Sequence, residues 1–348
     1  MGKLVIKNED FEKAAIQFDR DLLKMPIFAI ADTTKYMTMR TGVTGTILIG
    51  TKSTKAQFAP YKANKKTDVD LNVVLRPLTT YFGSLNADFD PNEAISTLLG
   101  HRASQAMDGE LASTVTAREV LGLIGKEAAE AFVPAIWNAV RNPNGSTTKD
   151  LFDGFDTITE AAITDKELSE ELGNFLQLTE AITNANAEKI FKQILSFMSK
   201  KLRGRKAYLF CSQDISDAYN ESYKNSHGGI AYNQQYEQQY VEGSKKMLEI
   251  VPLPGKDGSQ FITISVKENM NVGVDQESDA ESVRVKEYAP DTLTYMARMF
   301  FGVQFKTVDP SYLLIVKLYQ APAAKDPEPA KGEGGNEGDG NEQGGETG

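Results

Sequence analysis

A lysine-rich stretch between two β-forming segments constrains the fold of this chain more than any other feature. Residues 41–67 contain five lysines and no aspartate or glutamate, although the whole chain of 348 residues carries a formal net charge of −10. The run Thr44–Thr51 is β-rich and bounded by glycines, and a second extended stretch is expected at Gln57–Lys62. Partial alternation of apolar residues over Val69–Leu75 predicts a strand that returns. The sequence therefore predicts a long basic β-hairpin near the N-terminus.

A second unusual element is the longest helical pattern in the chain, over about 116–141. It opens with the capping box Thr116-Ala-Arg-Glu119, whose two end side chains satisfy backbone N–H groups of the first turn. An apolar stripe follows at helical spacing. Pro134 lacks a backbone N–H and crowds the carbonyl of Glu130, so we expect a bend there. At ~1.5 Å per residue this helix would span roughly 40 Å and serve as a spine.

The remaining patterns mix helices and strands without a regular βαβ period, which predicts the α+β class. Helical spacing or start signals predict helices over 11–24, from Asp90, over 187–202, after Asp214 and over 290–300. β-Forming runs predict strands over 207–212, 261–266, 272–274, 283–286, 302–305 and 313–316. Residues 321–348 are rich in proline, glycine and acids and have almost nothing to bury, so this tail is expected to be disordered.

Composition excludes several classes of protein. Two histidines and one cysteine exclude a multi-ligand zinc or iron–sulfur site and an internal disulfide. Cys211 lies in an apolar strand pattern, so we expect a buried and inert thiol. The acidic balance argues against a sequence-specific nucleic-acid binder. The longest apolar run, Met25–Ala31, is too short to span a bilayer, and no signal peptide is visible, so we expect a soluble, cytosolic chain without a membrane partner.

A search for catalytic and binding motifs yields none. The chain contains no P-loop, no dinucleotide-binding Gly-x-Gly-x-x-Gly after a strand and no nucleophile elbow. The acidic string that starts at Asp88 fails as a calcium loop because Glu93 occupies its sixth position and Leu99 its twelfth. His101 and His227 are the only imidazoles, and a hydrolase that uses one of them with a carboxylate is kept as a minor hypothesis. No catalytic residue, cofactor or metal ion is therefore assigned.

Two further clusters each have more than one interpretation. Three cations at the end of a predicted helix either complement the helix dipole or contact phosphate; they are Lys200, Lys201 and Arg203. Three tyrosines at four-residue spacing form either one helical face or a contact surface at a loop; they are Tyr232, Tyr236 and Tyr240.

The order of these patterns resembles the major capsid proteins of tailed bacteriophages, which share the Hong Kong ninety-seven capsid fold. The resemblance covers about residues 1–320. It rests on the N-terminal arm, the long hairpin, the long helix and the run Leu151-Phe-Asp-Gly-Phe-Asp-Thr-Ile158. It continues with the helix–strand unit 187–212, the segment Glu268-Asn-Met-Asn-Val-Gly-Val-Asp275 and the run Phe300-Phe-Gly-Val-Gln-Phe305.

The resemblance implies a division of the chain into five parts. These are an N-terminal arm (1–40), an E-loop hairpin with its return strand (41–85), a peripheral domain with the spine helix (86–147 plus 270–320), an axial domain (148–269) and the disordered acidic tail (321–348). In such proteins the E-loop extends over a neighbouring subunit. The implied intersubunit contacts are Lys52, Lys55, Lys62, Lys65 and Lys66 in the E-loop and Tyr232, Tyr236 and Tyr240 in an axial loop.

The function implied by the resemblance is structural and not enzymatic. The chain would self-assemble, as pentamers and hexamers, into the icosahedral head shell of a tailed bacteriophage that encloses double-stranded DNA. Its partners would be further copies of itself, a portal, a separate scaffold protein and, without sequence specificity, the packaged DNA. It would reside in the host cytoplasm before assembly and in the virion afterwards. An encapsulin-like nanocompartment shell is the alternative within the same fold.

Overall fold

The computed structural model describes most of the chain between residues 30 and 320. The described ranges are 30–54, 71–89, 120–128, 130–227, 238–275, 283–289 and 292–320. The predicted helices over 11–24 and from Asp90, the capping box at 116–119, the stretch Gln57–Lys62 and the tail 321–348 lie outside these ranges. None of the helices in the described ranges is both long and apolar enough to cross a membrane.

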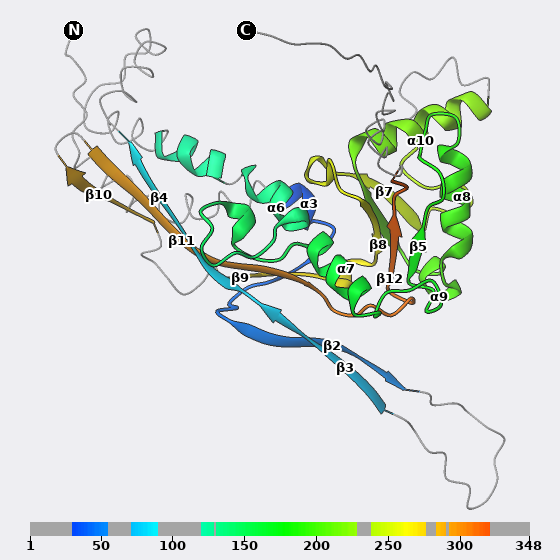
Figure 1. Cartoon of the computed structure of the whole chain (residues 1–348), viewed down its shortest axis with the longest axis horizontal. Coiled ribbons are helices and arrows are strands. Elements are labelled where there is room, and N and C mark those ends of the chain that lie inside the picture. Colours follow the sequence, from blue (N-terminus) through cyan, green and yellow to red (C-terminus); the bar gives the residue numbers. More distant parts are fainter. Residues whose placement is uncertain are drawn as a thin grey trace, which may run out of the picture.

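The first sheet gathers strands from distant parts of the chain (Figure 1). β11 (Thr292–Phe305) is its central strand and pairs antiparallel with β9 (Met270–Val274), with β10 (Val283–Ala289) and with β4 (Tyr81–Phe89). β1 (Thr38–Arg40) pairs parallel with β9 at the edge. β9 is fully buried, whereas the edge strand β1 is half-buried.

The prediction of a helix over 290–300 is wrong for residues 292–300, because these belong to β11. Leu293 and Tyr295 are buried while their neighbours are partly exposed, which is the alternation of a strand with one covered face. Nine consecutive residues of β11 pair with β4, from Leu293 opposite Phe89 to Phe301 opposite Tyr81. This long-range pairing outweighs the weak local preference for a helix.

The second sheet has the order β5-β12-β8-β6-β7. Its strands are β5 (Phe175–Gln177), β12 (Leu313–Lys317), β8 (Phe261–Ser265), β6 (Ala207–Cys211) and β7 (Leu248–Pro252). β12 pairs parallel with β5 and antiparallel with β8, whereas β6 pairs antiparallel with β8 and parallel with β7. The last strand therefore lies in a sheet whose other strands come from residues 175–265.

Helices on this second sheet differ in detail from the prediction. The expected helix over 187–202 is two helices, α8 (Ala187–Phe197) and α9 (Lys200–Arg203). They are separated because Met198 has an extended ψ of 139°. The side chain of Ser199 then caps α9 by accepting a hydrogen bond from the backbone N–H of Leu202. α10 (Gln213–Ser226) follows β6, with Ser212 at its N-cap and Asp214 in its first turn.

The predicted spine helix is interrupted. Residues 120–128 are helical, Ala131 forms a turn, and α6 (Phe132–Asn138) is a separate short helix. Pro134 is the third residue of α6, where its missing N–H costs no helical hydrogen bond. Its ring would clash with the carbonyl one turn earlier, so the helix breaks before the proline instead of bending at it. The sequence thus predicted the place where the helix is irregular, but it predicted a bend and not a break.

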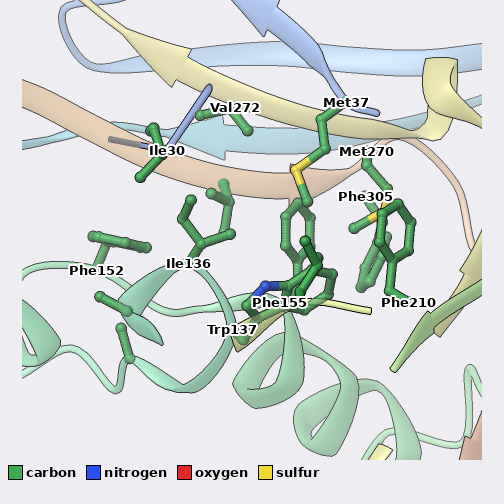
Figure 2. Close-up of a cluster of buried hydrophobic side chains, with 14 of the residues drawn as sticks. Ile30, Met37, Ile136, Trp137, Phe152, Phe155, Phe210, Met270, Val272 and Phe305 are labelled. Carbon is green, nitrogen blue, oxygen red and sulfur yellow. The ribbon is translucent and has the colours of Figure 1, made fainter. Parts of the chain in front are cut away.

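A core of aromatic side chains joins the two sheets (Figure 2). Trp137 of α6 packs against Phe155 of α7 (Phe155–Thr164) at 5.6 Å between ring centroids and against Phe210 of β6 at 5.4 Å. Phe155 in turn packs on Phe305 of β11 at 4.8 Å. Since these rings come from both sheets and two helices, the hydrophobic effect fixes the sheets relative to each other.

The other short elements are α3 (Ala31–Thr34), η1 (Thr148–Asp150), η2 (Pro254–Lys256) and η3 (Lys267–Asn269).

Candidate intersubunit surface

Two long strands project from the body as an isolated antiparallel ribbon (Figure 1). β2 (Thr46–Thr54) pairs with β3 (Leu71–Thr79), from Thr46 opposite Thr79 to Thr54 opposite Leu71. This pairing confirms the two flanking strands of the predicted hairpin, whose connecting residues 55–70 lie outside the described ranges. A two-stranded ribbon without a third strand is at best marginally stable in water. Something besides its own hydrogen bonds must therefore hold it.

The base of the ribbon is fixed to the body at Thr80. The hydroxyl of Thr80 donates to the carbonyl of Val43 at 2.8 Å and accepts from the backbone N–H of Gly45 at 2.9 Å. The base of the ribbon also passes close to the backbone of Gly302 in β11. A Cβ added to Gly302 would lie 2.2 Å from the carbonyl oxygen of Thr79, so only glycine permits the two strands to approach so closely. The ribbon therefore leaves the first sheet in a defined direction.

One ion pair also ties the ribbon to its own body. The guanidinium of Arg76 in β3 lies 2.8 Å from the carboxylate of Glu167, in the acidic segment 165–171. In the structure, one of these acids already pairs within the chain. Among the remaining acids of this segment, only the exposed carboxylates can form ion pairs with another molecule.

An apolar face of the ribbon is exposed to solvent. Leu48 is 65% exposed, Leu75 53% and Val73 42%. The register places all three on one face, because Gly50 lies opposite Leu75 and Lys52 lies opposite Val73. Large side chains that cluster on a projecting element and lack a covering layer mark a protein interaction site. The sequence contained this signal in the alternation of β3, but the face could be identified only once the register was known.

The structure places only some of the predicted contact residues. Lys52 is exposed on β2, on the apolar face just described. Tyr240 is half-buried and forms an isolated bridge with Glu249 of β7, so it belongs to the second sheet's edge. The other predicted contacts, Lys55, Lys62, Lys65, Lys66, Tyr232 and Tyr236, lie outside the described residues.

Of the two histidines, His227 lies at the end of α10 beside two carboxylates. Its ring nitrogens are 3.9 Å from Glu188 and 3.8 Å from Glu242. These three side chains offer donor atoms within 4.8 Å of one another, which is a spacing that could hold a metal ion. The ammonium of Lys192, however, already lies 2.5 Å from Glu188 and 2.9 Å from Glu242. The cluster is therefore a salt-bridge network that ties α8 to the loop before β7. His101, the other histidine, lies outside the described residues.

Replacing Lys192 with methionine should destabilise the unassembled subunit by about 1–2 kcal/mol, because Glu188 is buried and would lose its charged partner. Burial alone would raise the pKa of Glu188, but hydrogen bonds led by that from Lys192 hold it below its ordinary value. A depressed carboxyl pKa stabilises the fold above about pH 4.3, and this stabilisation is lost as pH falls through the folded-state pKa.

Urea denaturation at pH 7 and at pH 3.5 measures this effect. The wild type should lose more stability on acidification than the Lys192→Met variant. Equal pH dependence in the two proteins would contradict the assigned network. Lys189→Met is a matched control, since Lys189 on the same helix is largely exposed and pairs with the exposed Glu180 at 3.5 Å.

Cys211 behaves as the sequence predicted. It is fully buried in β6, and burial raises the pKa of its thiol to about 12. At neutral pH the thiol therefore stays protonated and is a poor nucleophile.

Comparison with known proteins shows the fold. No protein-family model matches the chain, and no curated protein matches its sequence. A chain from the procapsid of satellite phage P4, solved with its size determination (Sid) protein, superposes with a TM-score of 0.52 and 11% identity. That match covers 86% of this chain and 98% of the other. The capsid of cyanophage A-1(L) gives a TM-score of 0.52 and 11% identity, over 85% of this chain and 92% of the other.

A third structure, the holo-SrpI encapsulin complex from Synechococcus elongatus PCC 7942, gives a TM-score of 0.45 and 10% identity over 82% of this chain and 87% of the other. At such low identity, the two matches above a TM-score of 0.5 establish the fold and nothing finer. The resemblance to the Hong Kong ninety-seven capsid fold is thereby confirmed at the level of the fold.

Proposed function

We propose that this chain is a shell-forming subunit, the major capsid protein of a tailed bacteriophage, which self-assembles into an icosahedral head around double-stranded DNA. The observation that carries the proposal is the projecting β2–β3 ribbon with its exposed apolar face. An isolated subunit gains nothing from such a face, whereas a neighbouring copy that covers it gains apolar burial. The fold shared with two phage capsid chains supports the same conclusion.

In the assembled shell, the ribbon would act as the E-loop and lie over the next subunit. Lys52 and the lysines of the segment that connects β2 to β3 would face acidic side chains of that subunit. Each exposed ion pair is worth only ~0–1 kcal/mol. Because a shell repeats every contact many times, weak contacts suffice for a stable particle and still allow wrongly placed subunits to dissociate. The net charge of −10 is no objection, since packaged DNA would be enclosed and not read by sequence.

Electron microscopy of the purified full chain tests the proposal. Negative staining should reveal closed particles built from pentamers and hexamers, with a scaffold protein co-expressed where the chain alone gives few. A protein that stays monomeric under all assembly conditions would refute the proposal. The content of particles isolated from the native source separates the two kinds of shell. Nuclease-protected double-stranded DNA fits a phage head, and an enclosed enzyme fits a nanocompartment.

A further inference from the structure

Seven exposed cations gather at one corner of the second sheet. They come from two stretches that meet where the backbone N–H of Ala207 donates to the carbonyl of Met247 at 2.8 Å. One stretch is α9 with the turn that leads into β6, and the other is the turn that leads into β7. We call this cluster the basic corner, and it consists of Lys200, Lys201, Arg203, Arg205, Lys206, Lys245 and Lys246.

The basic corner is barely neutralised by its own chain. Within the described residues, its single ion pair joins Lys206 to Glu249 at 3.2 Å. The guanidinium of Arg205 lies 4.4 Å from the ring centroid of Tyr312. This cation–π contact positions the guanidinium but does not neutralise its charge. Complementing the dipole of α9 does not explain the cluster, because α9 has four residues and most of the cations lie at or beyond its end. A chain of net charge −10 therefore concentrates positive charge here for another reason.

The turn before β7 presents its two lysines in a strained conformation. Lys245 has a φ of 54° and Lys246 a φ of 63°, and the backbone N–H of Met247 donates to the carbonyl of Ser244 at 3.0 Å. This is the geometry of a type I′ turn, in which Asn-Gly is the favoured pair. Lysine has no advantage for the fold at either position. Strain kept at exposed charged residues indicates that the charges are used.

A complementary surface lies on α10 of the same chain. Asp214, Asp217 and Glu221 are exposed and spaced by three and four residues, so they line one face of the helix. Within the described residues none of these three carboxylates forms an ion pair. We call them the acidic stripe. In Figure 1, α10 and α9 lie at opposite ends of the second sheet's helical layer, so the stripe and the corner lie in different places on the molecule.

We propose that the basic corner of one copy binds the acidic stripe of the next, head to tail. Two different complementary surfaces on one chain make a heterologous contact, which closes into a ring when the rotation per subunit permits. This inference rests on the proposed function, to which it assigns the lateral contact within pentamers and hexamers. A second copy is favoured over a nucleic acid as the partner because the matching charges are present on the chain itself.

A neutral variant tests the basic corner without harming the fold. Lys245→Asn combined with Lys246→Gly removes two charges and installs the preferred pair for this turn. The melting temperature of the unassembled subunit should rise, while ring formation at low salt should weaken roughly tenfold. Native mass spectrometry measures the rings. Lys166→Asn is the control, because Lys166 is likewise an exposed lysine with a positive φ, at 59°, and lies outside both the corner and the stripe.

Charge exchange gives the decisive result. One variant reverses the corner with Lys201→Glu, Lys245→Glu and Lys246→Glu, and the other reverses the stripe with Asp214→Lys, Asp217→Lys and Glu221→Lys. Each should fail to form rings alone, since like charges then face each other. Mixed together, they should form alternating rings with an even number of subunits, and therefore hexamers without pentamers. One chain that carries all six changes should again form rings by itself.

The outcomes separate the inference from the proposed function. If the wild type forms no rings or shells, the proposed function fails. If the wild type assembles and both reversed variants assemble equally well, the inference alone is overturned. If reversal of the corner leaves the rings intact but lowers the DNA retained by particles, the corner binds nucleic acid and the inference is again overturned. Ring formation that does not weaken as salt increases would also contradict it, because exposed charges are screened.

Discussion

Replacing Leu48 and Leu75 with aspartate abolishes particle formation, whereas the isolated subunit keeps its stability. We expect this result because both side chains are more than half exposed in the single chain, at 65% and 53%. Surface substitutions at such positions usually change the free energy of unfolding by less than about 0.5 kcal/mol. In a shell the same side chains would be covered by the next subunit, so their loss appears only on assembly.

The expected magnitude follows from the apolar area involved. Burying one leucine side chain contributes about 1.5–3 kcal/mol, and two aspartates in the same place would have to be desolvated without partners. The contact therefore weakens by at least ~3 kcal/mol, or more than about a hundredfold in its association constant. Since every subunit of a shell makes this contact, no particle should form at concentrations where the wild type assembles.

A matched control comes from an exposed leucine outside the ribbon. Leu172 is 53% exposed, as Leu75 is, but it lies outside the ribbon, so Leu172→Asp should leave the particle yield unchanged. Light scattering measures assembly, and urea denaturation checks the subunit. Wild-type yields from the Leu48→Asp/Leu75→Asp variant would show that the ribbon is not the contact. Reversal of Lys52, Lys55, Lys65 and Lys66 to glutamate tests the lysines separately, and unchanged yield would remove them from the interface.

The ribbon shows how far the sequence could predict this candidate site. The β-rich run Thr44–Thr51 and the alternation in Val69–Leu75 located both strands, because short strands with glycine boundaries leave a clear local signal. The apolar face depended on register. A slip of one residue would exchange the two faces of the ribbon, and no local pattern specified that Lys52 lies opposite Val73. The positive charge of the ribbon could therefore be predicted from the sequence, whereas its exposed apolar face could not.

Elements that depend on distant partners were predicted less well. Residues 292–300 lack strict helical or strand periodicity, and β4 on one side and β10 on the other decide that they form a strand. The break at Met198 likewise has no marker such as glycine or proline. It is stabilised from afar, because the hydroxyl of Ser199, which caps α9, donates to the carbonyl of Pro310 at 2.7 Å. The basic corner combines stretches about forty residues apart in the sequence, so the sequence analysis noted only three of its seven cations, Lys200, Lys201 and Arg203.

One buried ion pair could not be predicted from the sequence. The ammonium of Lys256 is fully buried in η2 and lies 2.7 Å from the carboxylate of Asp156, in the first turn of α7. It also donates to the carbonyl of Phe261 at 2.9 Å and lies 4.3 Å from the ring centroid of Trp137. The hydroxyl of Ser259 donates to the second carboxylate oxygen at 2.7 Å. Nothing near Lys256 in the sequence marks it as different from a surface lysine.

Breaking this pair should give the largest loss of subunit stability of any single change considered. Lys256→Met leaves a carboxylate without its partner in the core, and Asp156→Asn leaves an ammonium there, each at a cost of about 3–5 kcal/mol. Lys256→Met combined with Asp156→Leu removes both charges and should lose less than either single variant. Urea denaturation of the unassembled subunit measures all three. A double variant that is less stable than both single variants would show that the two groups are not coupled.

The Asp156→Asn variant should also differ from the wild type in how its stability depends on pH. Burial lowers the pKa of Lys256, although the carboxylate of Asp156 acts against this. Without that carboxylate the pKa falls further, so the unfolded state binds more protons as pH rises toward about 10.4, and the Asp156→Asn variant recovers stability relative to the wild type. Parallel pH profiles for Asp156→Asn and the wild type would contradict a buried ammonium that the carboxylate stabilises.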